Sequence, residues 1–150
     1  MYDKQTLKKF ESGLIQRWLD TFDRPDNGEQ RSALLDPTGE FIAIRNLPLP
    51  DGLSPDYVDA LIATDGFPGL PPIGIYILNK NNESLTGQLQ ERFNLFRDSS
   101  RHEAQALPGY TWICYHYADN RWSYRADDPA RGDNIRKFLM GFYAELGTGG

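Results

Sequence analysis

Four short apolar segments follow one another between residues 32 and 78, and turn-forming residues separate them. The segments are Ala33-Leu34-Leu35, Phe41 to Ile44, Tyr57 to Thr64 and Ile73 to Leu78. The stretches between them are rich in Pro, Gly and Asp and leave no room for a crossover helix. Because consecutive strands with short links pair as neighbours, the sequence predicts a four-stranded antiparallel meander.

Helical patterns lie on both sides of this meander. Residues 3 to 23 predict an amphipathic helix, because apolar side chains recur there at spacings of three and four. A short helix is predicted from Ser84 to about Arg97, and a closing helix is predicted after Asp133, the expected N-cap, with Gly147 as its stop. We therefore expect one α+β domain over residues 1–150, in which the opening helix can cover one face of the meander.

The first predicted helix also carries a basic face. Lys4, Lys8 and Lys9 lie off its apolar stripe, together with Arg17. These side chains form either a solvated face or a docking surface for an acidic partner.

Charge and hydropathy exclude several classes of function. The net charge is −5 and no stripe of basic and aromatic residues is present, so nucleic acid is not an expected partner. No apolar run approaches the roughly 18 residues of a membrane span. The start Met1-Tyr2-Asp3-Lys4 does not resemble a signal peptide. We expect a cytoplasmic protein with no membrane partner.

Cys114 is the single cysteine of the chain, so no internal disulfide is possible. An apolar segment, Tyr110 to Ile113, predicts a strand that ends near the thiol, and a polar loop follows at Ala118 to Arg121. A lone cysteine is usually a buried hydrophobe without chemistry, but a partly hydrated strand end favours a nucleophile. His102, His116 and Cys114 are too few ligands to predict a zinc site.

A proline-rich turn, Phe67-Pro68-Gly69-Leu70-Pro71-Pro72, precedes the fourth apolar segment. Proline fixes φ and removes a backbone donor, so this turn is expected to be rigid. Together with Ile113-Cys114, and with Trp122-Ser123 eight residues beyond the cysteine, it resembles the ubiquitin-conjugating enzymes. Their order of parts also matches: an N-terminal helix, a four-stranded meander, the proline-rich turn, the cysteine loop and a C-terminal helix. The structural motif of this resemblance comprises Phe67, Pro68, Pro71, Pro72 and Trp122.

The chain also departs from that family. The His-Pro-Asn motif that usually precedes the cysteine is absent, and that position reads Arg101-His102-Glu103-Ala104-Gln105. The stretch between Pro72 and Cys114 is longer than usual, and we assign the insertion to a segment near 79–105. These differences resemble divergent bacterial members encoded beside an activating enzyme, a ubiquitin-like protein and a deconjugating peptidase, several of them linked to antiphage defence.

The resemblance implies that Cys114 receives a ubiquitin-like protein from an activating enzyme as a thioester and passes it to the amine of an acceptor protein. It implies no cofactor. Without the family's asparagine, His116 and Asn120 are the residues expected to support the oxyanion. If the strand continued past Cys114, His116 would face the same side as the sulfur. Structural roles for both residues stay open, with Asn120 in a turn beside Asp119.

Two other interpretations also stay open. The absent His-Pro-Asn favours a catalytically inactive binding module that scaffolds a partner enzyme or the modifier, whereas the cysteine at the expected place favours the carrier. The C-terminal Gly149-Gly150 would suit a conjugated modifier, but the predicted order of strands and helices does not match a β-grasp fold. The sequence specifies neither the modifier, nor the acceptor, nor the oligomeric state.

Overall fold

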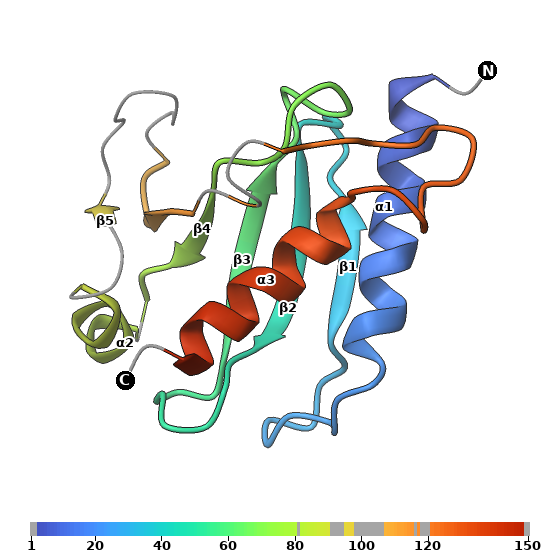
Figure 1. Ribbon diagram of the computed structural model, residues 1–150. Coiled ribbons are helices and arrows are strands. Elements are labelled where there is room, and N and C mark those ends of the chain that lie inside the picture. Colours follow the sequence, from blue (N-terminus) through green and yellow to red (C-terminus); the bar gives the residue numbers. More distant parts are fainter. Residues whose placement is uncertain are drawn as a thin grey trace.

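The sheet orders its strands as β1-β2-β3-β4-β6-β5, and every neighbouring pair is antiparallel. It belongs to a computed structural model that describes residues 3–80, 82–90, 95–97, 107–115, 117 and 121–148. The strands are β1 (Ser32–Leu35), β2 (Phe41–Pro48), β3 (Tyr57–Ala63), β4 (Gly74–Leu78), β5 (Leu95–Arg97) and β6 (Tyr110–Cys114). Within these residues the sheet therefore has six strands, and the predicted four form its β1 to β4 meander (Figure 1).

Strand β6 joins the sheet because its apolar residues pair along β4. Ile113 lies opposite Ile75, and Trp112 lies opposite Tyr76. The strand expected before the cysteine is thus confirmed, and the sheet has more strands than the four of the predicted meander. The short β5 pairs with the other edge of β6 and forms the last strand of the described sheet.

One face of the sheet forms the main core with the helices. Residues that lie opposite one another share a face, and Ile44, Ala60 and Ile77 follow this rule across three strands. Helix α1 (Lys4–Leu19) packs on β1 and β2, and helix α3 (Ile135–Thr148) crosses the same face in front of β2 and β3 (Figure 1). We call this the helical face and its opposite the second face. No helix of the described chain contributes a side chain to the cluster on the second face.

The helix ends follow local capping chemistry. Asp3 caps α1 by accepting a hydrogen bond from the Thr6 amide at 2.8 Å, and the helix ends at Leu19, short of the expected residue 23. Asn134 caps α3 by accepting from the Lys137 amide at 2.8 Å. The prediction that Asp133 is the N-cap of this helix is therefore wrong.

The carboxylate of Asp133 has other partners. It accepts from the Ser123 amide at 2.7 Å and from the Tyr117 hydroxyl at 3.0 Å, so it ties two segments of the chain together. Gly147, the expected stop, lies inside the last turn of α3.

The predicted helix from Ser84 to Arg97 is also corrected. Helix α2 spans only Glu83–Leu89, where Leu85 and Leu89 are buried in the main core. Leu95–Arg97 form strand β5 instead, with Phe96 opposite Trp112. The edge of β6 offers backbone hydrogen-bond partners, and this tertiary pairing outweighs the helical spacing of the apolar residues. Among the described helices, none has both the length and the apolar character needed to cross a bilayer.

Candidate active site

Cys114 is the last residue of β6, and its side chain lies on the second face of the sheet. It pairs with Gly74 of β4 and lies two residues after Trp112, which places both side chains on the same face. The side chain is half-buried and packs at the margin of a cluster formed by Tyr76 and Trp112. The expected position, at a strand end and partly in water, is confirmed.

The side chain of the residue that follows the cysteine lies on the helical face. The Tyr115 amide donates to the Ile73 carbonyl at 3.1 Å, and its ring meets Phe138 and Phe142 of α3 at centroid distances of 5.3 and 5.6 Å. Because β6 ends at Cys114, the condition under which His116 would share the face of the sulfur is not met. His116, Asn120 and His102 all lie outside the described residues.

The proline-rich turn is held by the segment that follows the cysteine. Trp122 Nε1 donates to the carbonyl oxygen of Pro68 at 2.7 Å. Beside it, the rings of Phe67 and Tyr124 meet edge to face with centroids 4.9 Å apart. The two motifs on which the resemblance depends are therefore in direct contact. Pro72 is buried and Pro71 is half-buried at the end of the turn, where β4 begins.

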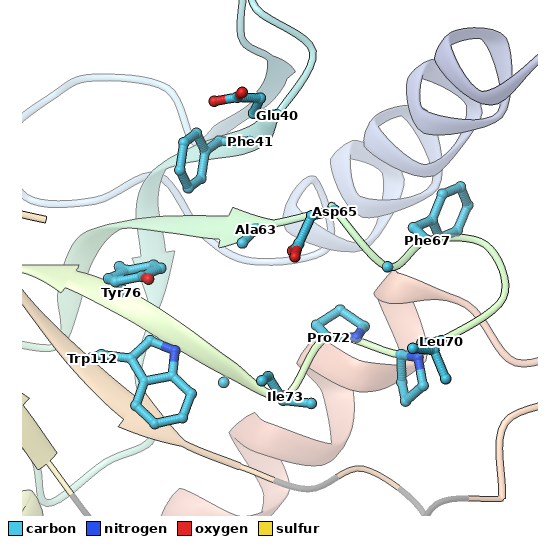
Figure 2. A pocket seen from close by; sticks show the side chains of 13 residues that line it. Glu40, Phe41, Ala63, Asp65, Phe67, Leu70, Pro72, Ile73, Tyr76 and Trp112 are labelled. Carbon is cyan, nitrogen blue, oxygen red and sulfur yellow. The ribbon is translucent and has the colours of Figure 1, made fainter. Parts of the chain in front are cut away.

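A pocket of about 390 Å³ opens between this turn and the second face of the sheet (Figure 2). Most of its walls are apolar, and its charged lining residues are Glu40 and Asp65. The lining residues are Glu40, Phe41, Ala63, Asp65, Gly66, Phe67, Leu70, Pro71, Pro72, Ile73, Gly74, Tyr76 and Trp112. Since Gly74 both lines the pocket and pairs with Cys114, the pocket borders the cysteine.

The side of the pocket nearest the cysteine depends on the absence of a side chain at Gly74. A Cβ atom on Gly74 would lie 2.6 Å from Cε2 and Cζ2 of Trp112, much closer than carbon atoms approach. The indole ring therefore occupies the space above this glycine. Trp112 is only 3% exposed, so its ring is fixed as part of the pocket wall.

The basic face of α1 differs from expectation at one position. Lys4 and Lys9 are exposed, but Lys8 is buried and its Nζ donates to the Gly39 carbonyl at 2.8 Å. The prediction that Lys8 lies on a partner-binding surface is wrong in placement, because its ammonium group is used inside the fold. Its long apolar stem lets it reach the Gly39 carbonyl from the edge of the apolar stripe.

Glu11 is a buried acid that the sequence analysis missed. Its Oε1 accepts from the Ile135 amide at 2.7 Å, at the first turn of α3, while Oε2 has no hydrogen-bond partner in the described chain. Burial raises the pKa of Glu11 to about 7, against the opposing effects of the Ile135 amide and Arg136. The signal was its spacing from Leu7 and Leu14, which places it on the apolar stripe.

The comparisons with known proteins provide no relative. No protein-family model matches the chain, and neither the curated proteins nor the solved structures contain a match. Within the described residues, no group of three or more His, Cys, Asp or Glu side chains is arranged to hold a metal ion.

Proposed function

We propose that this protein is a thioester carrier of the ubiquitin-conjugating type, in which Cys114 accepts a ubiquitin-like protein from an activating enzyme and passes it to an acceptor amine. The observation that carries the proposal is the hydrogen bond from Trp122 Nε1 to the Pro68 carbonyl at 2.7 Å. It joins the proline-rich turn to the residues beyond the cysteine, the two motifs that first suggested the family. The meander between an opening and a closing helix supports the proposal, because ubiquitin-conjugating enzymes have the same order of these parts.

In the first proposed step, the Cys114 thiolate attacks the acyl carbon of the thioester on the activating enzyme. The new carbon–sulfur bond forms on Cys114, and the activating enzyme's thiolate leaves. In the second step an acceptor amine attacks the same carbon, the Cys114 thiolate leaves, and the amine proton passes to a base or to water. A half-buried thiol at a strand end leaves room for both approaches.

Other residues have supporting roles in the proposal. His116 and Asn120 are proposed to support the oxyanion, since a positioned donor contributes a factor of about 10² to 10³ in acyl transfer. Lys4 and Lys9 are proposed to meet an acidic surface of the activating enzyme, because both are exposed on α1. We place this activity in the cytoplasm of a bacterium, within a conjugation system that acts in antiphage defence.

The test is a loading assay with the activating enzyme, the ubiquitin-like protein and ATP. The wild-type protein should gain an adduct that a reducing agent removes, and Cys114→Ala should not. Cys114→Ser should trap an adduct that resists the reductant, because an oxygen ester exchanges poorly with thiols. A reductant-sensitive adduct on the alanine variant would overturn the proposal, because the chain has no second cysteine.

The absent His-Pro-Asn motif favours a second candidate, an inactive binding module that holds a partner enzyme or the modifier. This candidate predicts a stable complex with one of those partners, no adduct on Cys114, and unchanged binding by Cys114→Ala. The same loading assay, read together with co-purification of the two proteins, separates the two functions.

A further inference from the structure

We propose that the pocket between the proline-rich turn and the second face of the sheet binds a segment of a partner protein that carries an apolar side chain between basic residues. The pocket's volume of about 390 Å³ falls within the range of roughly 300–1,000 Å³ that is usual for ligand sites. The proposal does not depend on a thioester at Cys114, so it can succeed or fail independently of the carrier function.

The pocket wall is suited to an apolar side chain. The aromatic rings of Phe41, Tyr76 and Trp112 line it from the sheet, and Pro72 and Ile73 line it from the end of the turn (Figure 2). Transfer of an apolar group from water into such a site is favourable in proportion to the area it buries. The occupant therefore contributes an aliphatic or aromatic group.

The charge of the pocket selects basic neighbours for that group. Glu40 and Asp65 are both exposed, and neither forms an ion pair within the described residues. Glu40 comes just before β2 and Asp65 just after β3, and these strand ends are held together where Phe41 pairs with Ala63. With two carboxylates and no cation in the lining, the pocket attracts Lys or Arg and repels acidic residues.

The pocket is formed before any ligand arrives. Trp122 holds Pro68 through its hydrogen bond, and Tyr124 packs on Phe67, so the turn is fixed against the sheet. Trp112 is fixed above Gly74 on the opposite side. A preformed site binds without first having to order its own side chains and backbone.

An extended protein segment fits this surface better than a small isolated ligand. Leu70 lines the pocket and is 65% exposed, so the apolar surface continues over the rim. The exposed Leu70 side chain gives a peptide backbone an apolar surface at the rim of the pocket. The apolar group then enters the pocket while its basic neighbours stay near the two carboxylates.

The experiment titrates two end-blocked tripeptides, Lys-Trp-Lys and Glu-Trp-Glu, into ¹⁵N-labelled Cys114→Ala protein at low salt, followed by NMR. The probes share an aromatic ring and carry flanking side chains of opposite charge. We expect saturable shifts of the Trp112 indole signal and of the Leu70 and Ile73 amides, with at least tenfold tighter binding of Lys-Trp-Lys. Equal affinity for the two probes, shifts centred on another surface, or no saturable binding would overturn the proposal.

Matched variants separate the charge from the apolar wall. Glu40→Gln with Asp65→Asn should reduce the preference for Lys-Trp-Lys to less than threefold. The control pair, Asp26→Asn with Asp51→Asn, makes the same change in net charge at exposed positions outside the pocket and should preserve the preference. An equal loss of the preference for Lys-Trp-Lys in both pairs of variants would mean that only the net charge of the protein matters. That result would contradict binding at the pocket.

The exposed rim residue tests the apolar contribution. Leu70→Ser should weaken binding of Lys-Trp-Lys at least threefold and keep the amide spectrum of a folded protein, because Leu70 is already largely in water. Unchanged affinity in Leu70→Ser would show that the segment does not cross the rim. The Glu40 and Asp65 variants should still load a thioester in the assay above, so failure of this inference is distinguishable from failure of the carrier function.

Discussion

Trp122 Nε1 and the carbonyl oxygen of Pro68 lie 2.7 Å apart and join positions separated by 54 residues in the sequence. The proline-rich turn has few backbone donors of its own, since proline lacks an N–H group. A side chain from beyond the cysteine therefore supplies one of the contacts that hold the turn. The cysteine strand and the turn are positioned together as a result.

Removal of this hydrogen bond should loosen the turn. Trp122→Phe keeps an aromatic ring but loses the donor, so we expect the free energy of unfolding to fall by about 1–2 kcal/mol. Trp18→Phe is the matched control, since Trp18 is also half-buried and has aromatic contacts with Phe22 and Tyr143. Urea unfolding of the three proteins measures the effect. A loss in Trp122→Phe no larger than in Trp18→Phe would show that the bond contributes little.

The buried acid Glu11 should make stability depend on pH. Its pKa is raised from 4.5 when exposed to about 7 in the fold, so the folded state binds the proton more tightly than the unfolded state. The contribution of Glu11 to the free energy of unfolding is therefore fully present below pH 4.5. It is lost as the pH rises to about 7. At about 1.4 kcal/mol per pKa unit, the loss is on the order of 3 kcal/mol at most.

Glu11→Gln tests this directly. Glutamine keeps an oxygen that can accept from the Ile135 amide but cannot ionise, so the variant should gain stability over wild type between pH 4.5 and 7. Unfolding free energies measured from pH 4 to pH 8 give the difference. Glu29→Gln, at an exposed position, is the control and should follow wild type. Parallel curves for wild type and Glu11→Gln would contradict the raised pKa.

Much of the fold is predictable because its contacts are local in sequence. Strands β1 to β4 pair in chain order, and the alternation in β3 places Val58, Ala60 and Ile62 on one face without reference to distant residues. Helices α1 and α3 follow from apolar spacing in the same way. The position of Cys114 at a strand end followed from the apolar run before it.

The remaining features depend on partners that are distant in the sequence. Glu11 is buried because it meets the first turn of a helix 124 residues away. Lys8 is buried because Gly39 presents a carbonyl oxygen to it. The pocket needs the turn, the sheet and Trp112 at once, and no local pattern places these three together. The spacing of apolar residues predicts which face of a helix or strand a residue lies on. It does not predict which atom of another element the residue contacts.

The two kinds of lysine on α1 should respond differently to charge reversal. Lys4→Glu with Lys9→Glu should leave stability within about 0.5 kcal/mol, because both are exposed, and should slow loading by the activating enzyme, most clearly at low salt. Lys8→Glu should lower the free energy of unfolding by at least about 2 kcal/mol, because it buries an unpaired charge beside the Gly39 carbonyl. Equal loading rates for wild type and the double variant across a salt series would show that Lys4 and Lys9 form a solvated face and not a docking surface.

His116 should matter more for transfer than for loading. The proposed carrier lacks the asparagine that ubiquitin-conjugating enzymes use, so another donor would have to meet the oxyanion when an amine attacks the thioester, and His116 is close to Cys114 in sequence. His116→Ala should load normally but discharge to free lysine at least about tenfold more slowly, which corresponds to roughly 1.4 kcal/mol of transition-state stabilisation. His116→Gln keeps a donor and should recover part of the rate. Single-turnover discharge from pH 6 to pH 9 measures both variants, and an unchanged rate in His116→Ala would remove the histidine from the mechanism and make Asn120 the next residue to test.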